Sequence, residues 1–151
     1  EAGPVIIDVL TLFPKMFEGP LSESMLKRAA AKGAVTVRGH DLRDFSRDKH
    51  RKADDRPFGG GPGMVMKVEP LVRAVRSVQA ADPLGPGRLL LMCPQGRVFD
   101  QRLAGELAGE RRLVLIAPRY EGYEWKQIGR DVVLVAIATG IVYEILENIL
   151  D

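Results

Sequence analysis

The chain has 151 residues, of which 46% are apolar and 28% charged, and its formal net charge is +2. This composition is that of a globular protein with a sizeable core, and it excludes a disordered chain. Cys93 is the only cysteine, which excludes an internal disulfide, and no run reaches the roughly 18 consecutive apolar residues of a membrane span. We therefore expect one domain over residues 1–151, in a reducing, cytoplasmic compartment and without membrane contact.

The first part of the chain predicts two strands with helical segments between them. Residues 5–10 form a β-branched apolar run that is typical of a buried strand. Pro14 opens a helical segment, Ser22 is a candidate N-cap for a further helix, and Gly33 ends that helix. A second strand is predicted over residues 35–38, and a basic, glycine-rich loop follows it.

The alternation of helices and strands continues after that loop. A helix with one apolar face is predicted near Pro70, then a loop over residues 82–87 and a buried strand over residues 89–92. A short helix near residues 103–107 and a strand over residues 113–117 come next. This order predicts an α/β fold with a mostly parallel sheet and helices on both faces. Ligands of such sheets bind beyond the carboxyl ends of the strands.

Basic residues are concentrated in one window of the sequence. Seven of the 22 basic residues lie between Arg38 and Arg56, together with both histidines and five aspartates. The window runs into Gly-Gly-Gly-Pro-Gly at residues 59–63, where backbone N–H groups can approach an anionic ligand closely. A charged run by itself is more often a solvated loop. Beside the glycines it favours nucleic acid, a nucleotide or another anionic ligand, and it does not choose among them.

Two of the predicted strands end in loops with unusual side chains, at residues 93–96 and 118–122. Gln95 offers both donors and acceptors, and the backbone amides of its loop can read the edge of an adenine ring. Tyr120 can stack on a ring, and Glu121 can accept a hydrogen bond from a ribose hydroxyl or hold a cationic ligand. The alternatives are a plain strand-to-helix turn and a surface ion pair within the second loop. Two histidines and one cysteine, widely spaced, do not make a metal site.

Five motifs occur in a fixed order along the chain. They are Leu12-Phe13-Pro14-x-Met16-Phe17, Arg43-Asp44-Phe45-x-x-Asp48-Lys49-His50, the run from Asp54 to Met64 (DDRPFGGGPGM), Pro94-Gln95-Gly96-Arg97 and Arg119-Tyr120-Glu121-Gly122. Over about residues 5–124 the sequence resembles the bacterial tRNA (guanine-N1)-methyltransferase family, and the third motif is highly specific.

The resemblance implies a SPOUT-class α/β fold whose C-terminal part threads a trefoil knot. It also implies homodimers that bind S-adenosylmethionine in the knot and methylate N1 of the tRNA guanine 3′ of the anticodon. By resemblance, the methyl donor is bordered by Leu91, Met92, Cys93, Pro94, Gln95, Gly96, Pro118, Arg119, Tyr120, Glu121, Gly122, Ile128 and Gly129. The residues expected to face tRNA are Arg43, His50, Asp54, Arg56, Gly60, Gly61 and Gly63.

The sequence departs from the family pattern after Gly122. Ile128-Gly129 is kept, but the paired glycines and the tyrosine that normally follow are not, and Pro118 stands where a glycine is usual. The apolar residues within 141–150 recur at helical spacing and predict a final core-facing or dimer helix.

The chain stops at Asp151, before the family's helical tRNA-gripping domain and before the aspartate proposed as general base. The catalytic residues are therefore unknown. We expect a truncated or altered N-terminal domain of a tRNA methyltransferase, with weak or no activity. The alternatives are a non-catalytic module that binds RNA or S-adenosylmethionine, and a structural dimerisation core.

Overall fold

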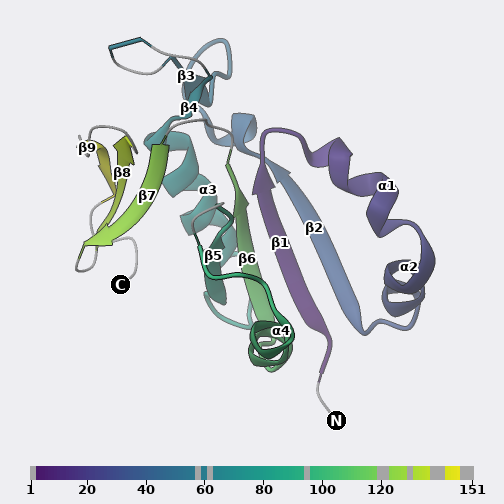
Figure 1. Ribbon diagram of the computed structural model, residues 1–151. Helices are drawn as coiled ribbons and strands as arrows, with labels where there is room; N and C mark the ends of the chain where they lie inside the picture. The colour runs from purple at the N-terminus through teal and green to yellow at the C-terminus, as the bar shows by residue number, and fades with distance from the viewer. Residues whose placement is uncertain are drawn as a thin grey trace.

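A four-stranded parallel β-sheet forms the centre of the molecule. The computed structural model describes residues 3–56, 59–60, 63–93, 96–118, 123–128, 131–136 and 142–146. The strand order is β2-β1-β6-β5, so the first strand lies inside the sheet (Figure 1). The expected mostly parallel α/β fold is thus confirmed. The strands are β1 (Val5–Thr11), β2 (Val35–Asp41), β5 (Arg88–Leu91) and β6 (Arg112–Ala117).

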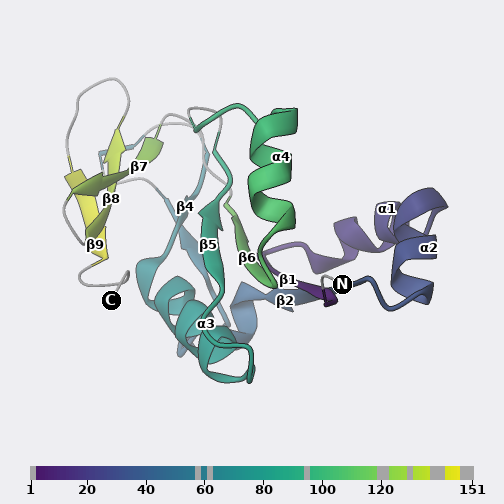
Figure 2. The ribbon, with the colours of Figure 1, turned by 90° about the horizontal axis from the view of Figure 1, so that it is seen from below.

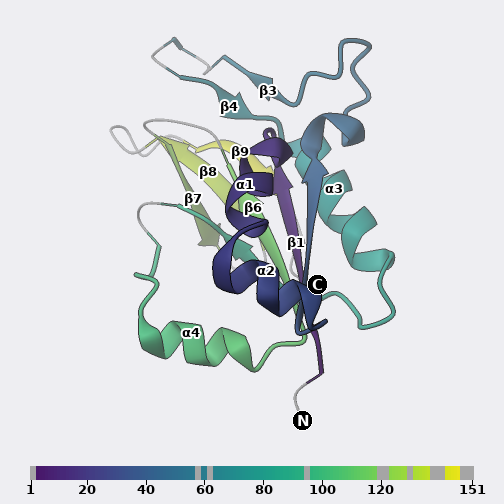
Figure 3. The same ribbon diagram turned by 90° about the vertical axis from the view of Figure 1, so that its right-hand side faces the viewer.

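Right-handed crossovers explain which face of the sheet each helix covers. The connections from β1 to β2 and from β5 to β6 cross the sheet in one direction, and that from β2 to β5 crosses it in the other. Because such connections are right-handed, the helices between β1 and β2 and between β5 and β6 lie on one face of the sheet. The helix between β2 and β5 lies on the opposite face. Figures 2 and 3 show this arrangement, with α3 opposite α1, α2 and α4. The helices are the 3₁₀ turns η1 (Pro14–Phe17) and η2 (Leu42–Phe45), and α1 (Glu18–Leu21), α2 (Ser24–Ala31), α3 (Val68–Ala80) and α4 (Gln101–Ala108).

Local chemistry sets the ends of the helices. Asp100 caps α4, because its carboxylate accepts a hydrogen bond of 2.7 Å from the main-chain N–H of Leu103. Gly33 follows α2 with a φ of +68°, in the left-handed region that favours glycine. The predicted N-cap at Ser22 is wrong. Ser22 lies at the C-terminal end of the short α1, where its hydroxyl donates to the carbonyl of Gly19 at 2.9 Å.

The main hydrophobic core lies between the sheet and α3. Alternate residues of the central strands, among them Leu10, Val114 and Ile116, are at most 4% exposed and form one cluster with the helix. The predicted apolar face of α3 is confirmed, since Leu71 and Val75 are buried in that cluster. Fully burying each such side chain contributes about 1.5–3 kcal/mol before entropy costs are counted. This core fixes the strands whose ends carry the predicted site.

A buried ion pair crosses the same face of the sheet. Asp8 in β1 and Arg112 in β6 have side chains only 1% and 2% exposed, and Arg112 Nη2 lies 2.9 Å from Asp8 Oδ2. Arg112 also donates to the carbonyls of Val78, at 2.5 Å, and Gly85, at 2.6 Å. A cation at these carbonyls is favourable because Val78 lies in the last turn of α3. Arg112 therefore joins the sheet to the end of α3.

The edge strand β2 adds two side chains to this buried charge. Arg38 Nε and His40 Nε2 lie 2.9 Å and 2.8 Å from Asp8 Oδ1. Arg38 also reaches Asp82 in the loop after α3, with Nη2 2.7 Å from Asp82 Oδ2. Asp8 and Asp82 together offset the charges of the two guanidinium groups, which makes burial of the cluster tolerable.

Two antiparallel sheets complete the described structure. A two-stranded pair, β3 (Asp54–Asp55) and β4 (Val65–Met66), brackets the glycine loop, and a three-stranded sheet follows β6 (Figure 1). The strands of the latter are β7 (Tyr123–Ile128), β8 (Asp131–Ala136) and β9 (Val142–Leu146).

The prediction of a final helix over 141–150 is wrong for residues 142–146, which form β9. This stretch is rich in β-branched and aromatic residues, which suit a strand, and it pairs with β8. Residues 141 and 147–150 lie outside the described residues, as does part of the segment expected to form the knot. In the portion that the structure describes, none of the helices has the length and apolarity needed to cross a membrane.

Candidate functional site

The two loops predicted to bind the methyl donor leave neighbouring strands at the same edge of the sheet. Leu91 at the end of β5 is in register with Ile116 of β6, and the N–H of Met92 donates to the carbonyl of Ile116 at 2.9 Å. Cys93 and Pro118 therefore follow adjacent parallel strands. This is the carboxyl edge, where α/β sheets bind ligands.

The first of these loops turns sharply and exposes apolar surface. The N–H of Gly96 donates to the carbonyl of Cys93 at 3.3 Å, which closes the turn. Met92 is 50% exposed and directly follows the half-buried strand β5. An exposed apolar side chain at a strand end is compatible with a nucleoside-bearing ligand. Of the other predicted donor-site residues, Ile128 ends β7, and Pro94, Gln95, Arg119, Tyr120, Glu121, Gly122 and Gly129 lie outside the described residues.

The basic window leaves the carboxyl edge of β2 as a loop ordered by its own hydrogen bonds. The Ser46 hydroxyl donates to the carbonyl of Lys52 at 2.6 Å. The N–H of His50 donates to Asp48 Oδ1 at 2.7 Å, and that of Arg51 to the Asp48 carbonyl at 2.8 Å. The hydrogen bond from His50 lowers the pKa of Asp48 below its ordinary value of 3.8. These hydrogen bonds fix the backbone of the loop, and the side chains of residues 47–52 are exposed.

Ion pairs within the chain occupy only part of the basic charge in this window. Arg51 pairs with Asp44, and Arg47 Nε lies 3.8 Å from Glu69 Oε1. Arg38 belongs to the buried cluster around β1. Four basic residues of the window are exposed and make no ion pair with the residues that the structure describes: Lys49, His50, Lys52 and Arg56. His50 and Arg56 were both predicted to face tRNA.

The glycine loop is attached to the antiparallel pair β3–β4. Asp54 is in register with Met66 in that pair, so the predicted Asp54 lies at the base of the loop. Gly60 and Gly63 have φ values of +81° and +86°, a conformation that favours glycine, and both are exposed. A Cβ added at Gly60 would meet no atom within 4 Å, so its backbone is open to a ligand. Gly61 lies outside the described residues.

Arg43, also predicted to face tRNA, is held by contacts within the chain. Its Nη1 donates to the main-chain carbonyl of Leu12 and lies 3.4 Å from Asp41 Oδ1. Its main-chain N–H donates to the same Asp41 oxygen at 2.9 Å, and its guanidinium carbon lies 5.5 Å from the centroid of the Phe13 ring. No sequence pattern indicates these contacts, because the main partner is a backbone carbonyl from a segment 31 residues away.

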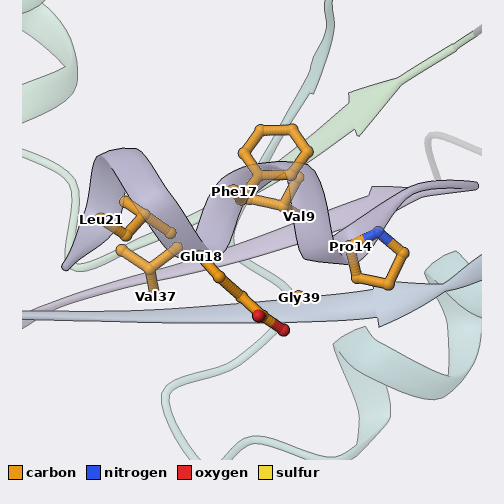
Figure 4. Close-up of a pocket in the computed structure, with 7 residues that line it drawn as sticks. All are labelled: Val9, Pro14, Phe17, Glu18, Leu21, Val37 and Gly39. Atoms are coloured by element: carbon orange, nitrogen blue, oxygen red, sulfur yellow. The ribbon is translucent and has the colours of Figure 1, made fainter.

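A separate pocket of about 180 Å³ lies between α1 and the face of β1 and β2 (Figure 4). Its walls are apolar, apart from the carboxylate of Glu18, which extends across it over β2. None of the predicted donor or tRNA residues lines this pocket. Its lining residues are Val9, Pro14, Phe17, Glu18, Leu21, Val37 and Gly39.

Comparison with known proteins accounts for this arrangement. A tRNA (guanine-N(1)-)-methyltransferase from Chloroflexus aggregans is 55% identical over 117 residues, which are 78% of this chain and 46% of the relative. One from Geobacillus kaustophilus is 53% identical over 118 residues, 78% of this chain and 48% of the relative. The chain thus spans about half the length of the curated relatives it matches.

Solved structures and sequence families agree with these relatives. The crystal structure of tRNA (m1G37) methyltransferase from Aquifex aeolicus matches 79% of this chain and 53% of its own, with a TM-score of 0.71 and 36% identity. The model of the family described as tRNA (Guanine-1)-methyltransferase TrmD matches residues 5–141. On this evidence of sequence and fold, the chain belongs to the tRNA (guanine-1)-methyltransferase family.

Proposed function

We propose that this protein takes part in transfer of a methyl group from S-adenosylmethionine to N1 of the tRNA guanine 3′ of the anticodon. The observation that carries the proposal is that three segments leave the sheet at the same edge. The two donor loops follow β5 and β6, and the basic loop follows β2 at the same edge. Membership of the family points to methyl transfer to tRNA as the reaction at this edge. We place the protein in the cytoplasm, where its tRNA substrate is found.

The described residues suit binding and alignment rather than proton removal. Guanine N1 carries a proton at neutral pH, so its methylation needs a general base. S-Adenosylmethionine, when bound, supplies a methyl group already activated by a sulfonium. The chain's own contribution is then to hold two ligands in line, with Met92 and the Gly96 turn on the donor side and the basic loop on the RNA side. No described residue is assigned the role of general base.

Donor binding is tested by titration calorimetry with S-adenosylmethionine. We expect saturable binding by the chain, weakened about fivefold to tenfold in Met92→Ala because an apolar contact is lost. Leu84→Ala is the matched control, since Leu84 is 37% exposed in the loop that precedes β5, at the opposite end of that strand from the donor loop. If the unmodified chain does not bind S-adenosylmethionine, the alternative of a structural dimerisation core is favoured instead.

RNA binding is tested by measuring the affinity for a tRNA transcript over a range of salt concentrations. Each lost phosphate contact lowers the slope of log affinity against log salt by about 0.7 to 0.9. We expect this reduction in both Lys52→Gln and Arg56→Gln, because both side chains are exposed and unpaired among the described residues. Lys27→Gln, an exposed lysine on α2, is the control and should keep the slope. Equal slopes in all four proteins would contradict an RNA-facing role for the loop.

A second copy of the chain is the proposed partner of the face that carries α1, α2 and α4. Large apolar side chains are exposed on or beside these elements, which is unusual for a surface facing water. Sedimentation of the chain is expected to show a dimer, and Phe99→Asp to shift it toward the monomer. A monomeric unmodified chain would contradict this assignment. The exposed residues are Met16 (72%), Met25 (78%), Leu26 (45%), Val98 (82%) and Phe99 (69%).

A further inference from the structure

Arg43 differs from the exposed, unpaired cations of the basic window because its guanidinium is already used inside the chain. We infer that Arg43 is a positioning residue, which fixes the loop of residues 46–56 against the segment that follows β1. In this role it does not contact RNA phosphate; it sets where Lys52 and Arg56 can do so. The inference rests on the proposed RNA-binding function and assigns a division of labour within that surface.

The contacts of Arg43 connect three points of the carboxyl edge. Its guanidinium donates to the carbonyl of Leu12, directly after β1, and its backbone and side chain both contact the Asp41 carboxylate at the end of β2. Its own carbonyl accepts from the N–H of Ser46 at 3.3 Å, where the loop begins. Leu12 is 2% exposed, and Leu42, the residue before Arg43, is 0% exposed, so both sides of this connection are anchored in the core. A displacement of Arg43 therefore moves the start of the loop.

Only an arginine satisfies these contacts together. The planar guanidinium donates along several directions at once and lies 5.5 Å from the centroid of the Phe13 ring, within cation–π range. A lysine at the same position keeps the charge but loses the forked donors and the planar contact. A glutamine loses the charge but keeps an amide donor. These two substitutions therefore separate position from charge.

The first arm of the experiment compares RNA binding by Arg43→Lys and Arg43→Gln with that of Lys52→Gln. A lost hydrogen bond to a charged donor changes an equilibrium by about tenfold. We expect Arg43→Lys to weaken tRNA binding by that factor with an unchanged salt slope. Arg43→Gln should also keep the slope, whereas Lys52→Gln lowers it by about 0.7 to 0.9. Affinity is to be measured on the active fraction, since a purely structural defect reduces that fraction and leaves the affinity of the remaining molecules intact.

The second arm measures amide hydrogen exchange and needs no RNA. In Arg43→Lys we expect faster exchange at Met16, Ser46 and His50, whose N–H groups are bonded within the two segments that Arg43 joins. The amides of β6 should exchange as in the unmodified chain. Arg28→Lys on α2 is the matched control and should change neither segment.

Each outcome supports or overturns the inference. Wild-type affinity in Arg43→Lys, with a reduced slope in Arg43→Gln, would make Arg43 a phosphate contact and overturn it. So would exchange that is unchanged everywhere, or that rises equally in β6, which indicates a loss of global stability alone. If the unmodified chain binds no tRNA, the proposed function fails, while faster exchange confined to the two segments still supports the positioning role.

Discussion

Asp8 is the residue on which the buried charge of the molecule converges. Its carboxylate meets Arg112, Arg38 and His40, and it is 1% exposed. Removing one partner of a buried ion pair costs about 3–5 kcal/mol, because the remaining charge is left uncompensated. We therefore expect Asp8→Asn to lower the free energy of unfolding by that amount, measured by urea denaturation.

The matched control for Asp8→Asn is Asp44→Asn, which breaks the exposed pair between Arg51 and Asp44. Surface pairs are worth at most about 1 kcal/mol. A similar small loss in both variants would show that the buried cluster contributes no more than a surface contact.

The ionised carboxylate of Asp82 stabilises the fold, and this contribution is lost in acid. The hydrogen bond from Arg38 lowers the pKa of the Asp82 carboxyl below its ordinary value of 3.8. The unfolded chain then binds the proton more readily than the folded one. The stabilisation is complete above pH 3.8 and is lost as the pH falls through the lower, folded value. Urea midpoints measured from neutral to strongly acidic pH should fall less steeply in Asp82→Asn, and parallel profiles would contradict this.

At the scale of elements, the turn before β5 depends on a glycine. Gly87 has a φ of +72°, and a Cβ added there would lie 2.9 Å from Cγ of the buried Arg112. We expect Gly87→Ala to destabilise the protein by more than about 1 kcal/mol, from both the clash and the backbone strain. Gly105→Ala is the control, since Gly105 lies inside α4 with nothing near its added Cβ. That change should stabilise by about 0.5–1 kcal/mol. Thermal unfolding of both variants measures the difference.

Sequence patterns predicted the elements whose local signals agree and failed where two signals compete. The apolar face of α3 and the Gly33 terminator agree with the structure because spacing and backbone preference indicate the same element. At residues 142–146 the apolar spacing suited a helix, but the β-branched composition and pairing with β8 decide for a strand. The prediction that Ser22 is an N-cap is wrong for a similar reason, because a serine can hydrogen-bond the backbone at either end of a short helix.

At the scale of the molecule, the sequence predicted that ligand loops share one edge but not which strands are neighbours. Periodicity identifies strands and is silent about their order, which here places β1 between β2 and β6. The buried cluster around Asp8 was equally hidden, although charged residues within two apolar runs are a signal that could have indicated it. Backbone contacts such as that of Arg43 with Leu12 leave no trace in a single sequence.

The pairing of Asp8 with Arg112 joins residues 104 positions apart, and this has a consequence for how the protein forms. β1 leaves the ribosome before its partner β6, which is synthesised only after both α3 and α4. Until then one edge of β1 and a buried-type carboxylate remain exposed, a state prone to aggregation. Nascent chains that end before Arg112 should therefore be recovered as insoluble or chaperone-bound material, and chains extended past Ala117 as native protein.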